Sequence, residues 1–223
     1  MHRIYRPTRS AEDWRDFLAS PEKQWKNGYS AKELAYAWES AEGWPPEVAT
    51  LLKSTAEFAD LKMNLAIPEH KVPLPGAGNP SQNDLFVLAA DGSGAVTIMV
   101  EGKATETFGQ PLGKWRQNAS DGKRRRLAHL QQVLGLLSDL PDSTRYQLLH
   151  RTASALMEAQ RFQARAAMLV IHSFSSTHQW FNDFAAFLDL FGVNAKPGQL
   201  HRVSTETTVP LYAGWVTGTP LSR

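Results

Sequence analysis

The chain contains no cysteine, and this absence excludes three kinds of chemistry. Without thiols there is no disulfide framework, no thiolate zinc site and no cysteine nucleophile. Long apolar runs are also missing, because no stretch approaches the roughly 18–20 residues that cross a bilayer. The N-terminal sequence MHRIYRPTRSAEDW is charged and lacks the apolar centre of a secretory signal. We therefore expect a cytoplasmic protein with no membrane partner.

An excess of one charge is absent as well, since 24 Lys and Arg face 22 Asp and Glu, a formal net charge of +2. A nucleic-acid partner would have to meet a local basic patch. One candidate is the run formed by Lys123, Arg124, Arg125 and Arg126. Cations at the start of a helix oppose the helix dipole, which favours a phosphate-binding role for this run. A solvated helix start is the alternative interpretation.

The length of 223 residues and the content of 42% hydrophobic and 21% charged residues are typical of one folded domain, covering 1–223. A loop rich in Pro and Gly is expected over 70–82. The other predicted elements are, in order, helices over 10–19, 30–42 and 45–52, a strand over 61–67, a β-hairpin of 84–90 and 95–104, helices over 121–138 and 142–162, a strand over 164–174, a helix over 177–192 and strands over 199–205 and 209–216. This order predicts an α/β fold with a mixed sheet flanked by helices.

Charged residues stand at one end of the predicted hairpin. Asp84 opens its first strand, and Glu101 and Lys103 close its second strand. Pairing through a short turn brings the start of one strand beside the end of the other, so Asp84 and Glu101 are expected to be neighbours. The alternation of side chains along a strand sends Glu101 and Lys103 to the same face. The sequence thus predicts two carboxylates and one ammonium group at one edge of the sheet.

These groups suit metal-dependent hydrolysis. The carboxylates of Asp84 and Glu101 and the carbonyl of Gly102 are hard oxygen ligands of the kind that Mg²⁺ or Mn²⁺ prefers. A bound metal lowers the pKa of its water and neutralises charge on a phosphodiester. Lys103 would orient or help to deprotonate the attacking water. The alternative interpretation is an incidental charged strand end in solvent or a cross-strand ion pair.

The string Asn83-Asp84, followed by Glu101-Gly102-Lys103, resembles the signature of the PD-(D/E)XK nuclease superfamily, which has the restriction-endonuclease-like fold. The element order over about 30–174 agrees with the superfamily core, and 177–216 would add a C-terminal helix and strands. The longer string PEHKVPLPG, SQND and VEGK is similar to an uncharacterised bacterial domain family within that superfamily. The resemblance implies Asp84 and Glu101 as metal ligands, Lys103 as the catalytic lysine and DNA as the substrate. Asn83 departs from the signature, which has Pro there.

An additional acid accompanies the signature in many superfamily members, commonly from the first helix. Glu33 and Glu39 are the candidates there, and Glu69, just before the predicted loop, is a third. Glu33 is our preferred choice. It has a competing role, because Ser30 and Glu33 have the spacing of a helix capping box.

Polar side chains also share one arc of the helix predicted over 142–162, namely Gln147, Arg151, Ser154 and Glu158. One interpretation is an ordinary amphipathic helix with its polar side in water. The other is that Gln147 and Arg151 reach the metal site or a phosphate, because related nucleases place a glutamine or a basic residue on the corresponding helix. Arginine is suited to bidentate phosphate contact.

Two other functions stay open at this point. The first is a catalytically inactive protein that keeps the nuclease fold for binding or assembly, and the second is a metal-dependent hydrolase of small molecules. A homodimer interface would account for the aromatic C-terminal third, although a core explains most of it; these residues are Trp180, Phe181, Phe184, Phe187, Phe191 and Trp215. The histidines lack the spacing of a zinc site.

Overall fold

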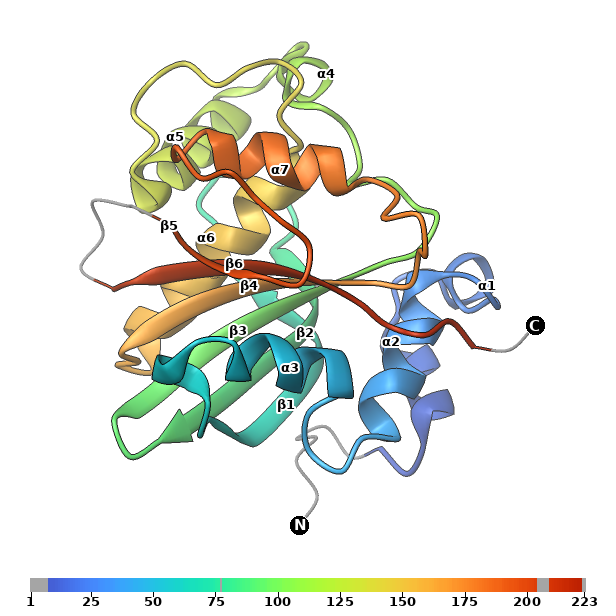
Figure 1. The fold of residues 1–223 in the computed structure, drawn as a ribbon. Coiled ribbons are helices and arrows are strands. Elements are labelled where there is room, and N and C mark those ends of the chain that lie inside the picture. The colour runs from blue at the N-terminus through green and yellow to red at the C-terminus, as the bar shows by residue number, and fades with distance from the viewer. Residues whose placement is uncertain (1–7, 77, 204–208, 222–223) are drawn as a thin grey trace.

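A six-stranded mixed sheet lies between two layers of helices in the computed structural model, which describes residues 8–76, 78–203 and 209–221 (Figure 1). Its strands are β1 (Lys62–Val72), β2 (Ser81–Asp91), β3 (Gly94–Lys103), β4 (Ala166–Ser173), β5 (Leu200–Val203) and β6 (Leu211–Thr217). The strand order is β1-β2-β3-β4-β6-β5. The neighbours β3–β4 and β4–β6 are parallel, and the other pairs are antiparallel. The predicted α/β fold with a mixed, helix-flanked sheet is confirmed.

The hairpin of β2 and β3 occupies the second and third positions of this sheet. Its strands are joined by a tight turn at which Asp91 pairs with Gly94. Continuous apolar sequence lets both faces of β3 be covered. Met99 packs into the core on the α6 side of the sheet, whereas its neighbour Val100 packs into the core on the opposite side. The hairpin is therefore fixed from both faces, which holds the charged residues at its end in place.

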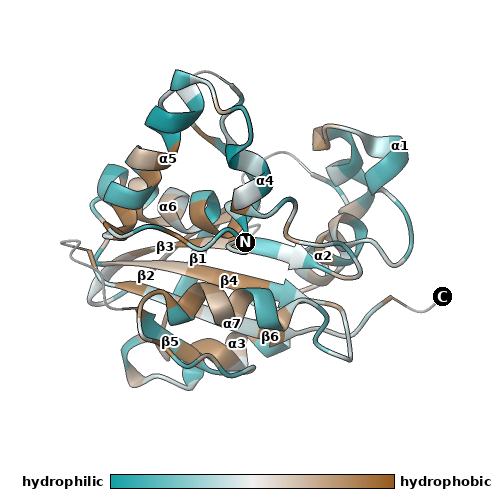
Figure 2. Ribbon diagram, turned by 90° about the horizontal axis from the view of Figure 1, so that it is seen from above, coloured by the Kyte–Doolittle hydropathy of each residue, from teal (hydrophilic) through white to brown (hydrophobic). Residues whose placement is uncertain are grey.

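The helices divide between the two faces of the sheet. They are α1 (Pro21–Gln24), α2 (Ser30–Glu39), α3 (Pro46–Lys53), α4 (Leu112–Arg116), α5 (Asp121–Leu134), α6 (Tyr146–Arg161) and α7 (Phe181–Asp189), with 3-10 helices η1 (Ala11–Phe17) and η2 (Ala56–Phe58). In Figure 1, α5, α6 and α7 lie above the sheet and α3 lies below it. Figure 2 shows the hydrophobic residues of the strands and helices gathered where these layers meet. Among the C-terminal aromatics, Phe184, Phe187 and Trp215 are buried in the core above the sheet.

Several elements differ from the sequence prediction, among them the loop expected over 70–82 and helix α4. The loop expected over 70–82 is shorter, because β1 continues to Val72 and β2 begins at Ser81. Pro68 lies inside β1, where it is tolerated because β1 is an edge strand. The five-residue helix α4 has no counterpart in the prediction, since it is too short to show a periodic pattern. Within the described residues, no helix combines the length and the apolar character needed to cross a membrane.

Candidate functional site

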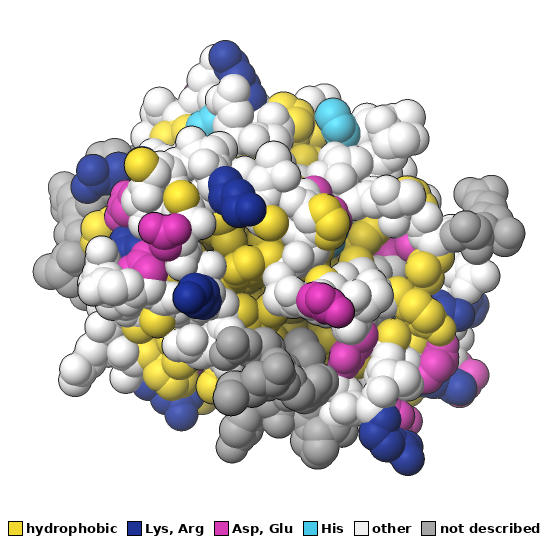
Figure 3. All heavy atoms as spheres, turned by 60° about the horizontal axis from the view of Figure 1, so that its bottom comes forward, with side chains coloured by type: hydrophobic (Ala, Val, Ile, Leu, Met, Phe, Trp, Pro, Cys, Tyr) yellow, Lys and Arg dark blue, Asp and Glu magenta, His cyan; other side chains and the backbone are white. Residues whose placement is uncertain are grey.

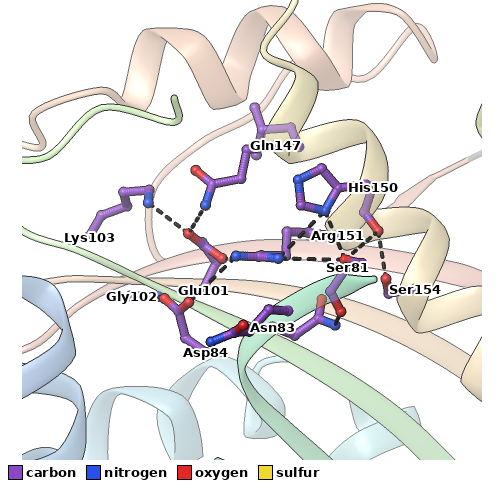
Figure 4. A network of polar contacts seen from close by, with 12 residues as sticks. Ser81, Asn83, Asp84, Glu101, Gly102, Lys103, Gln147, His150, Arg151 and Ser154 are labelled. Carbon is purple, nitrogen blue, oxygen red and sulfur yellow. Dashed lines mark hydrogen bonds and ion pairs between the residues drawn. The ribbon is translucent and has the colours of Figure 1, made fainter. Parts of the chain in front are cut away.

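The hairpin register brings the predicted acids together. Leu85 pairs with Val100, so the preceding residue Asp84 falls opposite Glu101 at the open end of the hairpin (Figure 4). Oδ2 of Asp84 accepts a hydrogen bond of 2.9 Å from the Gly102 amide, and Nζ of Lys103 donates to Oε1 of Glu101 at 2.7 Å. The predicted convergence of these side chains is confirmed. It occurs at the carboxyl ends of the parallel strands β3 and β4, where open α/β sheets commonly bind ligands.

Helix α6 supplies two more polar groups to this cluster. Nε2 of Gln147 donates to Oε1 of Glu101 at 2.6 Å, and Nε of Arg151 donates to Oε2 of Glu101 at 2.5 Å. Nη2 of Arg151 also lies 3.6 Å from Oδ1 of Asp84. Gln147 and Arg151 thus contact the predicted acids, while their predicted contact with a metal or a phosphate stays a prediction. The alternative, a polar side of α6 in water, is wrong, because Arg151, Ser154 and Glu158 are buried.

Glu69 adds a third carboxylate from β1. Pro68 pairs with Leu85 and His70 pairs with Asn83, so Glu69 falls opposite Asp84. Its side chain accepts a hydrogen bond of 2.6 Å from Gln82 Nε2. The backbone φ of Glu69 is 52°, in the left-handed region that non-glycine residues disfavour. Backbone strain of this kind clusters at functional sites, because the surrounding structure must hold it in place.

Glu33 and Glu39 are used elsewhere. Oε1 of Glu33 accepts from the Gly28 amide at 3.0 Å, and Oε2 accepts from the Leu221 amide at 2.6 Å. Glu39 accepts from the indole of Trp14 at 2.8 Å. The choice of Glu33 as the additional acid is therefore corrected: the carboxylate that joins Asp84 and Glu101 is that of Glu69.

The predicted capping box at α2 does not form either. The residue that caps the N-terminus of α2 is Tyr29, so Ser30 is already helical. The amide and hydroxyl of Ser30 both donate to Oε1 of Glu106, at 2.8 and 3.1 Å. Oε2 of Glu106 accepts from the Ala104 amide at 3.1 Å. Glu106 thus joins the start of α2 to the segment that follows β3, and the local spacing of Ser30 and Glu33 gave no sign of this distant partner.

Burial and the excess of carboxyl groups over cationic side chains determine the ionisation of the cluster. Burial raises the pKa of Glu101, but the charges of Arg151 and Lys103 outweigh burial and lower that pKa to about 2. Burial and the neighbouring Glu101 carboxylate raise the pKa of Asp84 to about 7. Burial and the Asp84 carboxylate raise the pKa of Glu69 to about 8. Three carboxyl groups share two cationic side chains, so near neutral pH the cluster favours an added proton or cation.

We expect the folded protein to lose stability as pH rises through this range. The pKa values of about 7 for Asp84 and about 8 for Glu69 lie above the ordinary 3.8 and 4.5. The folded state therefore binds more protons than the unfolded state between these limits, so the free energy of unfolding falls with rising pH. Thermal unfolding without metal should give a lower Tm at pH 8 than at pH 5.5, and Asp84→Asn should reduce the difference. An unchanged difference in the variant would contradict the assigned ionisation.

His150 and Ser81 lie beside Arg151 and were not singled out from the sequence. The Ser81 hydroxyl and Nδ1 of His150 are 2.8 Å apart, and Nη1 of Arg151 lies 3.5 Å from each of them. Burial and the Arg151 charge lower the pKa of His150 well below its ordinary value, so His150 is neutral. A period-2 pattern in β2 could have indicated Ser81, but nothing local predicts its partner on α6.

Asn83 and Gly102 have structural contacts that explain their residue types. The Asn83 amide is fully buried and donates to the carbonyls of His70 and Ser81, both at 3.1 Å. It thereby fixes β1 against the start of β2, next to Asp84. A Cβ at Gly102 would lie 3.3 Å from the Cβ of Ser30 and 3.5 Å from Oδ2 of Asp84. The metal-ligand role predicted for the Gly102 carbonyl stays a prediction.

The basic run on α5 lies outside this cluster. Arg126 is buried, and its guanidinium donates to the carbonyls of Pro75 and Asn79 at 3.2 and 2.8 Å. This corrects its assignment to an exposed basic patch, because its charge is used to hold the 75–79 segment. Nζ of Lys123 donates to the Trp115 carbonyl at 3.2 Å, while Arg124 and Arg125 are exposed. Figure 3 shows the face on the other side of the sheet from α5, where basic and acidic side chains are interspersed.

The oxygen atoms in this cluster are of the type that hard divalent cations prefer as ligands. Asp84, Glu101 and Glu69 line the same cleft, and the buried Oε1 of Gln147 has no hydrogen-bond partner. Arg151 lies against the same carboxylates, so a cation bound there would have to replace its guanidinium. In the part of the chain that the structure describes, no group of three or more Asp, Glu or His side chains forms a ready metal-ligand set.

Comparison with known proteins gives a family without a function. A family model described as "Domain of unknown function (DUF6946)" matches residues 7–220. No curated protein and no solved structure matches the chain. Functional inference therefore depends on the chemistry of the site itself.

Proposed function

The chain belongs to this family of unknown function, and we propose that it is a cytoplasmic metal-dependent nuclease that hydrolyses phosphodiester bonds of DNA with Mg²⁺ or Mn²⁺. The observation that carries the proposal is the convergence of Asp84, Glu101 and Lys103 at the carboxyl end of the parallel strands, with Gln147 and Arg151 added from α6. This arrangement supports the resemblance to the PD-(D/E)XK superfamily on which the proposed reaction rests.

Each side chain has a role that its contacts support. Asp84 and Glu101, with the Gly102 carbonyl, would hold the metal, which when bound supplies an acidic water and neutralises phosphate charge. Lys103 is held by Glu101 at 2.7 Å, and its ammonium is placed to orient the attacking water and contact the phosphate. Gln147 fixes the rotamer of Glu101 through its 2.6 Å hydrogen bond.

Arg151 acts as the counter-ion of the acids in the absence of metal. Its guanidinium contacts Glu101 and faces Asp84 at 3.6 Å. With these carboxylates committed to a divalent cation, the Arg151 guanidinium would be free to bind a phosphate group through paired hydrogen bonds. Arg151 therefore stays in the proposed machinery as the phosphate contact, which agrees with its predicted role in binding nucleic acid.

The proposal is tested by incubating labelled DNA and RNA, single-stranded and duplex, with Mg²⁺, Mn²⁺ or EDTA. We expect cleavage with a divalent metal and none with EDTA. Lys103→Met should reduce the cleavage rate by at least about 100-fold, the usual contribution of a positioned acid–base group. The matched control is Lys53→Met, since Lys53 is exposed on α3, away from the cluster. Cleavage in EDTA, or equal rates for Lys103→Met and the control, would refute the assignment.

One observation favours the alternative of a catalytically inactive nuclease-fold protein serving in binding or assembly. Both oxygens of Glu101 already accept hydrogen bonds, from Lys103 and Gln147 on one side and from Arg151 on the other. If this ion pair is permanent, neither Mg²⁺ nor Mn²⁺ will change the Tm, and no nucleic acid will be cut. Light scattering would then test whether the protein forms a homodimer.

A further inference from the structure

The acids lie at the bottom of a cleft of about 620 Å³. One wall comes from α1 and the start of α2, and the other comes from α6 and the segment 106–110. Glu101 and Lys103 are only 1% and 4% exposed. The walls are tied together, because Glu106 accepts hydrogen bonds from Ser30 on one side and Ala104 on the other. Hydrogen bonds therefore hold the cleft in shape, and its charged groups lie buried at its bottom.

This depth restricts what can reach the acids. A volume of about 620 Å³ is within the range of small-molecule sites, roughly 300–1,000 Å³, and cannot enclose a double helix. The phosphodiesters of an intact duplex stay on its outside, held there by base pairing. A nucleotide can place its base inside this cleft only when that base is unpaired from the opposite strand.

The cleft lining matches an unpaired nucleotide in chemistry. Among its lining residues, aromatic and amide side chains accompany the charged groups, namely Tyr29, Phe108, Tyr146, Gln24, Gln82, Gln110 and Gln147. Amides present donors and acceptors to base edges, and aromatic rings stack on bases of any sequence. The Tyr146 hydroxyl and Oε1 of Gln147 are buried without a hydrogen-bond partner. Tyr29 stands at the rim, 37% exposed, next to the exposed cation Lys26.

We infer that this cleft takes single-stranded DNA, so that a duplex is a substrate only where its strands are open. Tyr29 stacks on a base at the rim, and the glutamine amides contact base edges further in. The phosphodiester of the same strand then reaches Lys103 and Arg151. This inference rests on the proposed function and specifies the substrate form of the same site.

The single-strand inference is tested by measuring DNA binding separately from cleavage. Fluorescence anisotropy with a labelled 16-nucleotide strand, in Ca²⁺ and again in EDTA, is compared with the same strand in a blunt duplex. We expect the single strand to bind at least about tenfold more tightly. Tyr29→Ala should weaken single-strand binding by about tenfold, as expected for loss of one base–aromatic stack, and should leave duplex binding unchanged. Phe162→Ala is the control, because Phe162 is 36% exposed and lies outside the cleft.

The outcomes separate this inference from the proposed function. Equal or tighter binding of the duplex, or equal effects of Tyr29→Ala and Phe162→Ala, would overturn the single-strand assignment even if metal-dependent cleavage is observed. Tight and Tyr29-dependent single-strand binding without cleavage in Mg²⁺ or Mn²⁺ would uphold the inference and refute hydrolysis. Duplexes with a single-stranded overhang should bind like the free strand.

Discussion

Asp84→Asn is expected to abolish metal-dependent cleavage while leaving the protein folded. The substitution removes a carboxylate ligand, which should lower the rate by at least about 10³-fold through lost stabilisation of transition-state charge. The amide oxygen of Asn can still accept the hydrogen bond from Gly102. Because Asp84, Glu101 and Lys103 are proposed to act as one unit, a second substitution among them should add little. The measurement is the single-turnover cleavage rate in Mg²⁺ and Mn²⁺.

The folded state of this variant is a prediction in itself. Burial and the Glu101 carboxylate raise the pKa of Asp84 to about 7, so its ionised form is unfavourable in the folded protein. The Tm of Asp84→Asn at pH 8 should therefore equal or exceed that of the natural sequence. Asp189→Asn, at an exposed position on α7, is the matched control and should change neither rate nor Tm. Cleavage by Asp84→Asn at the control rate would remove Asp84 from the site.

Glu101→Gln is expected to cause the largest loss of stability. Glu101 is the anion shared by Lys103 and Arg151, and the three side chains are 1%, 5% and 8% exposed. Removing one partner of a buried ion pair leaves an uncompensated charge and costs about 3–5 kcal/mol. For a chain of this size the Tm should fall by roughly 6–20 °C. Thermal or urea unfolding at pH 7 measures the effect.

An exposed ion pair provides the comparison. Arg15 and Glu22 are in contact at 2.6 Å, with side chains 46% and 85% exposed. Glu22→Gln should therefore cost less than about 1 kcal/mol. Adding Arg151→Met to Glu101→Gln should restore part of the lost stability, because one unpaired buried cation is removed. If Glu101→Gln is no more destabilising than Glu22→Gln, the buried network does not have the energetic role assigned to it.

Much of the site could be predicted because it depends on local pairing. Two apolar runs around a tight turn define the hairpin, and the hairpin alone determines that Asp84 and Glu101 are neighbours. The 3.6-residue period of α6 likewise places Gln147 and Arg151 on one face. What the period could not decide was whether that face meets water or the sheet.

The features that were missed depend on distant contacts or on irregular backbone. Glu69 was a candidate but not the preferred one, because it follows a proline and has a left-handed φ of 52°, so no regular strand pattern places it beside Asp84. Glu33 and Ser30 fit a local capping motif, yet their partners are Leu221 and Glu106, far away in the chain. Arg126 reads as part of an exposed basic run, and only the position of the 75–79 segment explains its burial.

The most direct test of the account is a thermal-shift titration with Mg²⁺ and with Mn²⁺ at pH 8, comparing the natural sequence with Asp84→Asn and Asp189→Asn. A metal that binds only the folded state, at a free concentration 100 times its Kd, adds about 2.7 kcal/mol to the free energy of unfolding. This corresponds to a rise in Tm of roughly 5–10 °C. The account predicts that rise for the natural sequence and for Asp189→Asn, and its loss in Asp84→Asn. No rise in the natural sequence, or an equal rise in all three proteins, would contradict a metal site at these acids.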